Sequence, residues 1–279
     1  MKVALLGGSG FVGKGLARAL QARGDEPTVV SLRDPRYAAR AAAQCDAIVN
    51  LAGEPIAQRW TRAVKQRIFE SRTAAPRAFL EELSTMKGRA TRYLSASAID
   101  YYGTSADDAF DESSAAGTTF LANVCVAWER EAHGAQGLGM SVACIRTGLA
   151  LGNGGILARL LPLFRAGLGG RIADGSAWYS WIHIDDLAGI YLAALDGCEG
   201  PLNAVAPNPV TNAAFTRTLA ATLHRPAVFA VPTFAIALAL GEGACALLDR
   251  QRVLPKRALE LGYRFRFATL DEALRDLLA

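Results

Sequence analysis

The sequence predicts an α/β protein built around a doubly wound parallel sheet. Short apolar runs alternate with longer segments of helical periodicity, which is the pattern of strands joined by crossover helices. The chain has 279 residues, of which 51% are hydrophobic and 20% charged, so it can bury a substantial core. The first apolar run leads directly into the glycine-rich segment 7–13, which marks the turn from a first strand into a first helix.

Five short apolar runs are predicted to form strands of this sheet. Each is bounded by Gly, Asn or Asp and is too short to be a helix. They begin at Val3, Thr28, Ala47, Arg92 and Val142. Because helices are expected to cover both faces of the sheet, these strands are expected to be buried on both sides.

Three segments of helical spacing connect the strands, at 11–23, 65–83 and 120–133. The segment 34–45 is rich in alanine and contains no β-branched run, so it is expected to form one short helix and no strand. The third strand that usually lies outside the second one is therefore predicted to be missing. The second strand would then form the edge of the sheet.

A smaller α/β lobe is predicted after the character of the sequence changes at Gly148. Glycine pairs, two prolines around Asn208 and three helical segments follow. We expect a first domain at 1–165, with the chain returning to it near 181–205. The smaller lobe is expected at 166–279.

Two features of this lobe give local predictions. The last helix has a start signal, Thr269-Leu-Asp-Glu272, whose hydroxyl and carboxylate can each accept a backbone N–H bond. The longest uncharged run, 226–241, is broken by Pro232 and is shorter than the ~20 residues of a membrane-spanning helix. It is expected to be a buried helix.

The segment 7–13, GGSGFVG, has the context of a dinucleotide-binding loop, because it follows a predicted strand and opens a predicted helix. Gly7 permits the tight turn, Gly10 lets the backbone approach a pyrophosphate, and Gly13 lets the helix pack on the strand. The N–H groups at the helix start, at Phe11 and Val12, face the phosphates. The loop predicts a Rossmann-type site for NAD or NADP.

The choice between the two cofactors is expected at the end of the second strand, which reads Ser31-Leu32-Arg33. An arginine binds a 2′-phosphate through two donors, and Ser31 adds a hydroxyl. Asp34 leaves NAD open as the alternative, because a carboxylate there accepts bonds from the ribose. We expect NADP(H) to be preferred over NAD(H).

Composition excludes several classes of partner. Thirty Lys and Arg against 26 Asp and Glu leave a net charge of +4 without a basic stripe, so neither a nucleic acid nor a membrane is expected. The five cysteines are widely spread without a Cys-x-x-Cys pair, and no signal peptide precedes the first strand. We expect a cytoplasmic monomer or homodimer that acts on a small molecule.

Further motifs resemble the extended short-chain dehydrogenase/reductase superfamily, in particular its atypical, epimerase-like family with a characteristic C-terminal domain. These motifs are GGSGFVG, NLAGEPI from Asn50, SASAIDYYG from Ser95, AWEREA from Ala127, SWIHIDDLAG from Ser180, NAVAPNPVTN from Asn203 and QRVLPKRALELGYRF from Gln251. The resemblance implies a Rossmann domain that holds NAD(P) and a C-terminal lobe that closes over the substrate. It implies cofactor contacts from Asn50, Leu51, Ala52, Gly53 and Ser95, and substrate contacts from Glu54, Trp181 and His183.

The same resemblance exposes a departure in the catalytic residues. In the superfamily a tyrosine moves the proton, a lysine four residues later lowers its pKa, and a serine or threonine assists. None of the seven tyrosines here has a lysine four residues later. Leu121 and Cys125 align with the two positions, and Cys125 is expected to be a core thiol.

Ser97, Tyr101 and Tyr102 are the remaining catalytic candidates. Ser97 would hold the substrate oxygen and one tyrosine would supply the proton, with a pKa near the ordinary value of about 10 because no lysine is adjacent. Aromatic packing is the alternative role for both tyrosines.

The segment from Trp181 to Asp186 places one histidine near two carboxylates, but we expect no metal site there. A strand followed by a helix capped by Asp185 is the simpler interpretation.

Two functions follow from these observations. The first is an NADP(H)-dependent oxidoreductase or epimerase that acts on a carbonyl or secondary alcohol, with a nucleotide sugar among the candidate substrates. The second is a sensor or regulator that binds NADP(H) without catalysis, and the missing Tyr-x-x-x-Lys pair favours it. The retained Ser97 and the polar loop beside it favour the enzyme, which is the preferred interpretation. The word epimerase rests on the resemblance alone.

Overall fold

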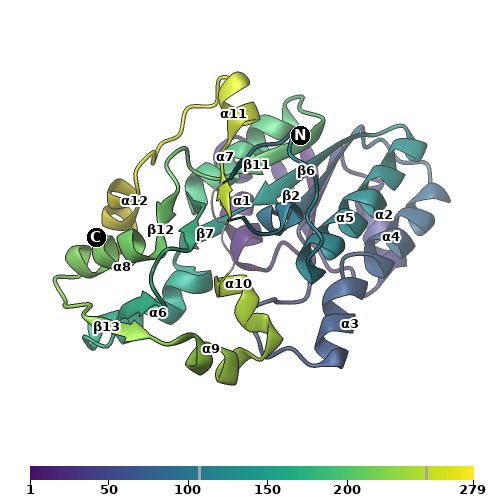
Figure 1. The fold of residues 1–279 in the computed structure, drawn as a ribbon. Helices are drawn as coiled ribbons and strands as arrows, with labels where there is room; N and C mark the ends of the chain where they lie inside the picture. The colour runs from purple at the N-terminus through teal and green to yellow at the C-terminus, as the bar shows by residue number, and fades with distance from the viewer. Residues whose placement is uncertain (106–107, 249–250) are drawn as a thin grey trace.

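A parallel sheet of six strands forms the centre of the fold in the computed structural model, which describes residues 1–105, 108–248 and 251–279 (Figure 1). In spatial order the strands are β2 (Glu26–Val30), β1 (Lys2–Leu6), β3 (Ala47–Asn50), β4 (Arg92–Ala98), β6 (Ser141–Thr147) and β11 (Gly200–Ala204). All five predicted strands are confirmed. β2 lies at the edge, and residues 34–45 contain only the helix α2 (Pro35–Ala42), so the predicted absence of the third strand is also confirmed.

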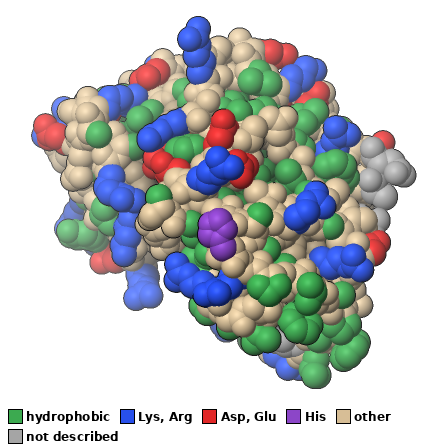
Figure 2. Space-filling view, turned by 90° about the vertical axis from the view of Figure 1, so that its left-hand side faces the viewer, with side chains coloured by type: hydrophobic (Ala, Val, Ile, Leu, Met, Phe, Trp, Pro, Cys, Tyr) green, Lys and Arg blue, Asp and Glu red, His purple; other side chains and the backbone are tan. Residues whose placement is uncertain are grey.

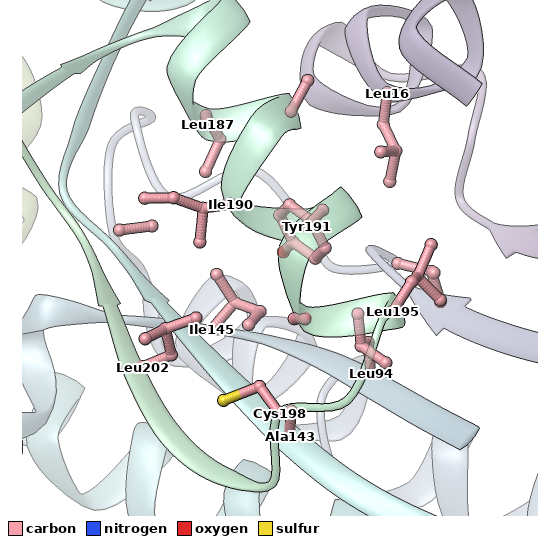
Figure 3. Packing of buried hydrophobic residues seen from close by; sticks show 14 of the residues in the cluster. Leu16, Leu94, Ala143, Ile145, Leu187, Ile190, Tyr191, Leu195, Cys198 and Leu202 are labelled. Atoms are coloured by element: carbon pink, nitrogen blue, oxygen red, sulfur yellow. The ribbon is translucent and has the colours of Figure 1, made fainter. Parts of the chain in front are cut away.

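Helices cover both faces of this sheet, which makes it doubly wound. One face carries α1 (Phe11–Ala22) and α7 (Ile184–Leu195), and the other carries α2, α4 (Ala74–Ser84) and α5 (Phe120–His133). On the first face Leu187 and Tyr191 of α7 pack with Leu16 of α1 over Leu94 and Ile145 of the sheet (Figure 3). These side chains are almost completely buried, so the two helices hold the glycine loop firmly against the strands.

The prediction of one helix at 65–83 is wrong. The segment forms two helices, α3 (Arg62–Glu70) and α4, separated at residues 71–73. Pro76 in the first turn of α4 has no N–H to donate to the carbonyl of Arg72, and this interrupts the helical bonding. The Thr73 hydroxyl instead donates to the carbonyl of Phe69 at 2.9 Å.

A smaller part of the structure, mostly C-terminal in sequence, combines helices with short two-stranded sheets. Its helices are α6 (Gly155–Arg165), α8 (Asn212–Thr222), α9 (Thr233–Leu240), α10 (Cys245–Leu248), α11 (Lys256–Glu260) and α12 (Leu270–Leu278). The strand pairs are β7 (Leu149–Gly152) with β10 (Trp181–His183), β9 (Trp178–Tyr179) with β12 (Val210–Thr211), β8 (Gly170–Ile172) with β13 (Phe229–Val231), and β5 (Ala109–Phe110) with β14 (Arg252–Val253). Short 3₁₀ helices are η1 (Ile99–Tyr102), η2 (Gly134–Leu138) and η3 (Glu242–Ala244). Leu157, Phe164 and Trp181 belong to a separate core here.

Helix starts were predicted correctly in one case and incorrectly in another. The capping box of α12 is confirmed, because Thr269 and Glu272 each accept the other's backbone N–H. The cap of α7 is His183 and not Asp185: the His183 Nδ1 atom accepts the N–H of Asp185 at 3.0 Å. Asp185 lies inside the first turn, where its charge favours the positive end of the helix.

The uncharged run 226–241 was expected to be a buried helix, and this is wrong. Pro232 divides it into β13, which pairs with β8, and the eight-residue helix α9. Phe234 and Leu238 of α9 are 72% and 73% exposed. No helix among the described residues has the length and apolar character needed to cross a bilayer.

Charges of both signs are distributed over the surface. Figure 2 shows basic and acidic side chains interspersed on one face, in agreement with the net charge of +4.

Asp186 fastens the end of the chain to α7. Its carboxylate is buried and accepts the backbone N–H groups of Arg266 at 2.8 Å and Phe267 at 2.9 Å. It also accepts the Tyr263 hydroxyl at 3.1 Å. The neighbouring Asp185 is largely exposed. Among the residues that the structure describes, its carboxylate forms an ion pair only with Arg266.

Replacing the buried carboxylate is therefore expected to destabilise the protein strongly. In Asp186→Ala two backbone donors and a phenol lose their acceptor, and the free energy of unfolding should fall by about 2–4 kcal/mol. The control Asp185→Ala should cost less than about 1 kcal/mol. Urea denaturation of both variants measures the difference, and equal losses would contradict this account.

Candidate functional site

The glycine loop has the close backbone contacts that a dinucleotide site needs. Gly7 has a φ of +78°, and a Cβ there would lie 2.8 Å from the backbone of Ala52. A Cβ at Gly13 would lie 2.5 Å from the backbone of Gly8. At Gly10, which caps α1 without a side-chain bond, the nearest atom to a Cβ would be 3.5 Å away. The Gly8 and Gly10 N–H groups donate to the carbonyls of Leu5 and Gly7, so the N–H groups that face an anion are those at the uncapped start of α1.

The first residues of α1 connect this loop to the C-terminal part. The Phe11 ring lies against Gly152 and Gly154, and a Cβ on Gly154 would approach the ring to 2.6 Å. Val12 packs beside it at the edge of the core under α1 and α7. Phe11 thus joins the predicted phosphate loop to the start of α6.

Ser31 and Arg33 lie exposed where β2 ends at the edge of the sheet. The N–H of Arg33 donates to the Ser31 hydroxyl at 3.3 Å. Asp34 is the N-cap of α2, and its carboxylate accepts the N–H of Tyr37 at 2.9 Å. The carboxylate that kept NAD open as the alternative is therefore bound to its own helix.

The segment after β3 lies directly beside the glycine loop. Leu51 donates its N–H to the carbonyl of Leu6, and the Asn50 side chain accepts the N–H of Ala52 at 3.1 Å. Gly7 and Ala52 touch through their backbones. The structure thus brings together the two predicted cofactor segments. Ser95, by contrast, is fully buried on β4 and donates its hydroxyl to the Ala96 carbonyl.

Arg72 is a buried cation that the sequence reasoning missed. It is 7% exposed and donates to the carbonyls of Glu54 at 3.0 Å and Ile68 at 3.2 Å. A Cβ on Gly53 would lie 2.9 Å from its guanidinium carbon, which itself lies 4.9 Å from the centre of the Trp128 ring. Arg72 therefore fixes the backbone at Gly53 and Glu54.

Glu54, a predicted substrate contact, has protein partners of its own. Its carboxylate accepts the Gln58 amide at 3.0 Å and the Arg67 guanidinium at 3.4 Å. The bond from Gln58, followed by that from Arg67, lowers the pKa of Glu54. The side chain is thus a charged surface group beside the predicted cofactor segment.

A buried polar network connects the predicted catalytic residues. The Ser97 hydroxyl donates to Glu129 of α5 at 2.7 Å, and Glu129 also accepts two bonds from Arg146 of β6 at 2.8 Å. Arg146 donates to the Tyr102 hydroxyl at 3.0 Å, and Tyr102 donates to Asn203 of β11 at 2.7 Å. All of these side chains are buried, so Ser97 and Tyr102 have their hydrogen-bond partners inside the protein.

Charge is retained inside this network. Burial lowers the pKa of Arg146, but its bonds to Glu129 outweigh that effect and raise the pKa overall. Burial raises the pKa of Tyr102 to about 12, despite the opposing effect of Arg146, so the expected value near 10 is wrong for this residue. The ring of Tyr101 stacks on the Arg146 guanidinium, with 3.4 Å from its carbon to the ring centre.

The α5 positions aligned with the missing tyrosine and lysine are both apolar. Leu121 and Cys125 are each 3% exposed. Burial raises the pKa of the Cys125 thiol, which keeps it neutral, as expected for a core thiol.

Trp181 and His183 lie on β10, which pairs with β7 immediately after the end of β6. Trp181 is fully buried and donates its indole N–H to the carbonyl of Asn208 at 3.0 Å. The His183 Nε2 atom lies 3.3 Å from the Asp276 carboxylate of α12, and burial lowers the pKa of the ring. The described residues contain no cluster of three or more side chains suited to a metal ion.

A cavity of 170 Å³ lies where β4 and β6 end, which is where ligands bind in open α/β sheets. We call it the strand-end cavity. Residues of η1, β6, β7, α6, β8 and β9, and residues next to β10 and β14, line the cavity. They are Ile99, Asp100, Thr147, Gly148, Leu149, Ile156, Leu160, Ile172, Trp178, Tyr179, Ser180 and Gln251. Two residues of the predicted catalytic segment 97–102, Ile99 and Asp100, line this cavity. Neither was among the catalytic residues predicted from the sequence.

The buried ion pair gives a direct test of the network. Glu129→Gln leaves Arg146 as an uncompensated buried charge, so the free energy of unfolding should fall by about 3–5 kcal/mol. Glu131→Gln on the same helix is the control, because its partner Arg77 is 54% exposed, and it should cost about 1 kcal/mol or less. Guanidinium denaturation compares the two variants. A similar loss in both would show that the buried ion pair stabilises the protein no more than the exposed one.

Known proteins resemble this chain over its whole length. Residues 3–206 match the NAD dependent epimerase/dehydratase family, and residues 231–277 match a domain of unknown function, DUF1731. The human epimerase family protein SDR39U1 is 36% identical over 295 residues, which cover all of both chains, and YfhF of Bacillus subtilis is 34% identical over all of this chain and 98% of its own.

Solved structures give the same result. The crystal structure of human SDR39U1 (isoform 2) with NADPH has a TM-score of 0.90 at 32% identity and covers 99% of each chain. A nucleoside-diphosphate sugar epimerase from Corynebacterium glutamicum has a TM-score of 0.81 at 35% identity, over all of this chain and 58% of its own. The chain therefore belongs to the NAD-dependent epimerase/dehydratase family and ends in the DUF1731 domain.

Proposed function

We propose that the protein is an NADP(H)-dependent oxidoreductase or epimerase that acts on a carbonyl or secondary alcohol. The observation that carries this proposal is the glycine loop, whose close contacts at Gly7 and Gly13 leave an open backbone cradle at Gly10. When bound there, the cofactor would supply or accept a hydride. The domains predicted at 1–165 and 166–279 would then hold cofactor and substrate, respectively.

Different segments of the protein would bind different parts of the cofactor. Backbone N–H groups at Phe11 and Val12 would hold the pyrophosphate, because the start of α1 has no side-chain cap and the Gly10 N–H already donates to the Gly7 carbonyl. The segment Asn50–Gly53 would lie along the nicotinamide end, where Arg72 fixes its backbone. This arrangement would orient the cofactor toward the strand-end cavity.

Preference for NADP(H) is supported at the end of β2. Arg33 is exposed there with Ser31 beside it, and Asp34 is occupied as the cap of α2. The human relative's structure contains NADPH.

The segment from Ser97 to Tyr102 would support the chemistry in two ways. Ser97 and Tyr102 hold η1 in place through Glu129 and Arg146. Asp100, carried by η1, lines the cavity together with Thr147. We therefore expect the substrate to lie against η1 and the end of β6, with Tyr101 and the buried network as positioning groups.

A non-catalytic NADP(H) sensor is the second candidate. It is favoured by Leu121 and Cys125, which leave α5 without an acid or base at the positions aligned with the superfamily's tyrosine and lysine. Turnover of any carbonyl compound with NADPH would exclude this candidate. Tight NADPH binding without turnover on a broad substrate panel would favour it.

The cofactor assignment predicts the effect of Arg33→Ala. Loss of a two-donor contact to the 2′-phosphate should weaken NADP⁺ binding by about 10- to 150-fold, equivalent to about 1.5–3 kcal/mol, and leave NAD⁺ binding unchanged. Arg40→Ala, an exposed residue later in α2, is the control and should change neither affinity. Calorimetric titration of both nucleotides measures the ratio of NADP⁺ to NAD⁺ affinity. An unchanged ratio in Arg33→Ala would contradict the assignment of Arg33 to the 2′-phosphate.

A further inference from the structure

We propose that Arg72 binds the nicotinamide end of the cofactor and makes the protein select the reduced form, NADPH, over NADP⁺. This inference rests on the proposed function, because it concerns the same cofactor site. The nicotinamide ring is neutral in NADPH and positively charged in NADP⁺, so a fixed cation beside it favours the reduced form. Three features of Arg72 support the inference: its burial without a bound carboxylate, its unused N–H groups and its place among the strand ends.

Arg72 is a buried cation whose bound partners are neutral. Among the described residues two arginines are buried, Arg72 at 7% exposure and Arg146 at 3%. Arg146 shares two hydrogen bonds with the Glu129 carboxylate. The hydrogen-bond partners of Arg72 within the described chain are instead two carbonyls and one hydroxyl. Charged side chains are rarely buried without an opposite charge, so Arg72 is suited to a ligand that supplies electron-rich groups.

The acidic groups around Arg72 balance its charge only in part. Burial lowers the pKa of Arg72, and the nearby groups Cys125, Asp100 and Glu54 oppose this effect without reversing it. The Glu54 carboxylate accepts a bond from the Arg67 guanidinium at 3.4 Å, and Arg72 binds the backbone carbonyl of the same residue. A net positive charge therefore remains at Arg72.

Part of the Arg72 guanidinium is available for further hydrogen bonds. All of its bonds to the protein come from Nη1, at 3.0 Å to the Glu54 carbonyl, 3.2 Å to the Ile68 carbonyl and 3.4 Å to the Ser71 hydroxyl. In the part of the chain that the structure describes, Nε and Nη2 donate no hydrogen bond. A guanidinium carries five N–H donors, so Arg72 can bind ligand oxygens while Nη1 holds the backbone.

Arg72 lies beside the end of β3, on the path that the cofactor would follow. A Cβ on Gly53, which comes after β3, would lie 3.0 Å from the Arg72 Nη2 atom. Across the sheet the strands follow in the order β2, β1, β3 and β4, so Arg33, the glycine loop and Gly53 follow one another in space. A cofactor with its 2′-phosphate at Arg33 and its pyrophosphate at the glycine loop therefore extends toward Arg72 with its nicotinamide end.

The helix α5 has no cation at the position aligned with the superfamily's lysine, which is Cys125. Burial raises the pKa of the Cys125 thiol, and Arg72 is close enough for its charge to oppose this effect. The guanidinium carbon of Arg72 also lies 4.9 Å from the centre of the Trp128 ring of α5. The junction between α3 and α4 thus places a positive charge next to this part of α5.

The expected selection for NADPH is large enough to measure. Two positive charges about 12 Å apart, at an effective dielectric constant of about 20, repel each other enough to change a dissociation constant about tenfold, and a shorter separation gives more. The 2′-phosphate and the pyrophosphate are common to both forms, so their contacts cancel in the ratio of the two dissociation constants. The wild-type protein should therefore bind NADPH at least about tenfold more tightly than NADP⁺.

The test is calorimetric titration of the whole protein with NADPH and, separately, with NADP⁺. Arg72→Gln removes the charge and keeps a side-chain N–H donor, so the preference for NADPH should fall about tenfold. Arg72→Lys keeps the charge and should keep the ratio within about threefold of the wild-type value. Arg62→Met, at an exposed position of α3, removes the same charge from the surface and is the control, which should leave the ratio unchanged.

The results separate this inference from the proposed function. If the wild-type protein binds neither nucleotide, the proposed function fails and the inference fails with it. If both nucleotides bind but NADP⁺ binds as tightly as NADPH, the inference alone is overturned. It is also overturned if Arg72→Gln weakens both nucleotides by the same factor, because Arg72 would then act on the phosphates or the backbone. If Arg72→Gln does not fold by circular dichroism, the wild-type ratio decides.

Discussion

The buried ion pair between Glu129 and Arg146 is the interaction on which the arrangement of the site depends. It joins α5 to β6, and its hydrogen bonds extend through Ser97 to β4 and through Tyr102 and Asn203 to β11. Taking two charges out of water is costly. Here the cost is offset because the carboxylate and the guanidinium share two hydrogen bonds and each has a further hydrogen-bond partner. The geometry of this network holds η1, and with it the wall of the strand-end cavity.

The two halves of the site have different physical characters. The cofactor side is made of backbone: a glycine loop, a helix start and the segment after β3, which approach each other too closely for a Cβ at Gly7 or Gly13. The substrate side is made of side chains, mostly apolar, contributed by η1 and the C-terminal part. The first half can therefore be shared by all members of a large family, whereas the second can differ with a few substitutions.

The similarity of this chain to named epimerases does not by itself identify its substrate. A shared fold alone does not determine a substrate. The residues that line the strand-end cavity belong to this chain and come mainly from η1 and the C-terminal part. Leu121 and Cys125 are a further difference, because they stand at the positions aligned with the superfamily's acid–base pair.

The sequence by itself determined the parts of the protein that local patterns specify. The five strands, the missing third strand, the glycine loop and the capping box at Thr269 depend on residues close together in the chain. Tertiary structure decided the rest, because Glu129 meets Arg146 across 17 positions and Tyr102 meets Asn203 across 101. The exposure of α9 and the burial of Arg72 likewise depend on which surfaces the folded chain places against each other. A periodic pattern reports which side of an element is apolar, but it carries no information about which distant polar group will be its neighbour.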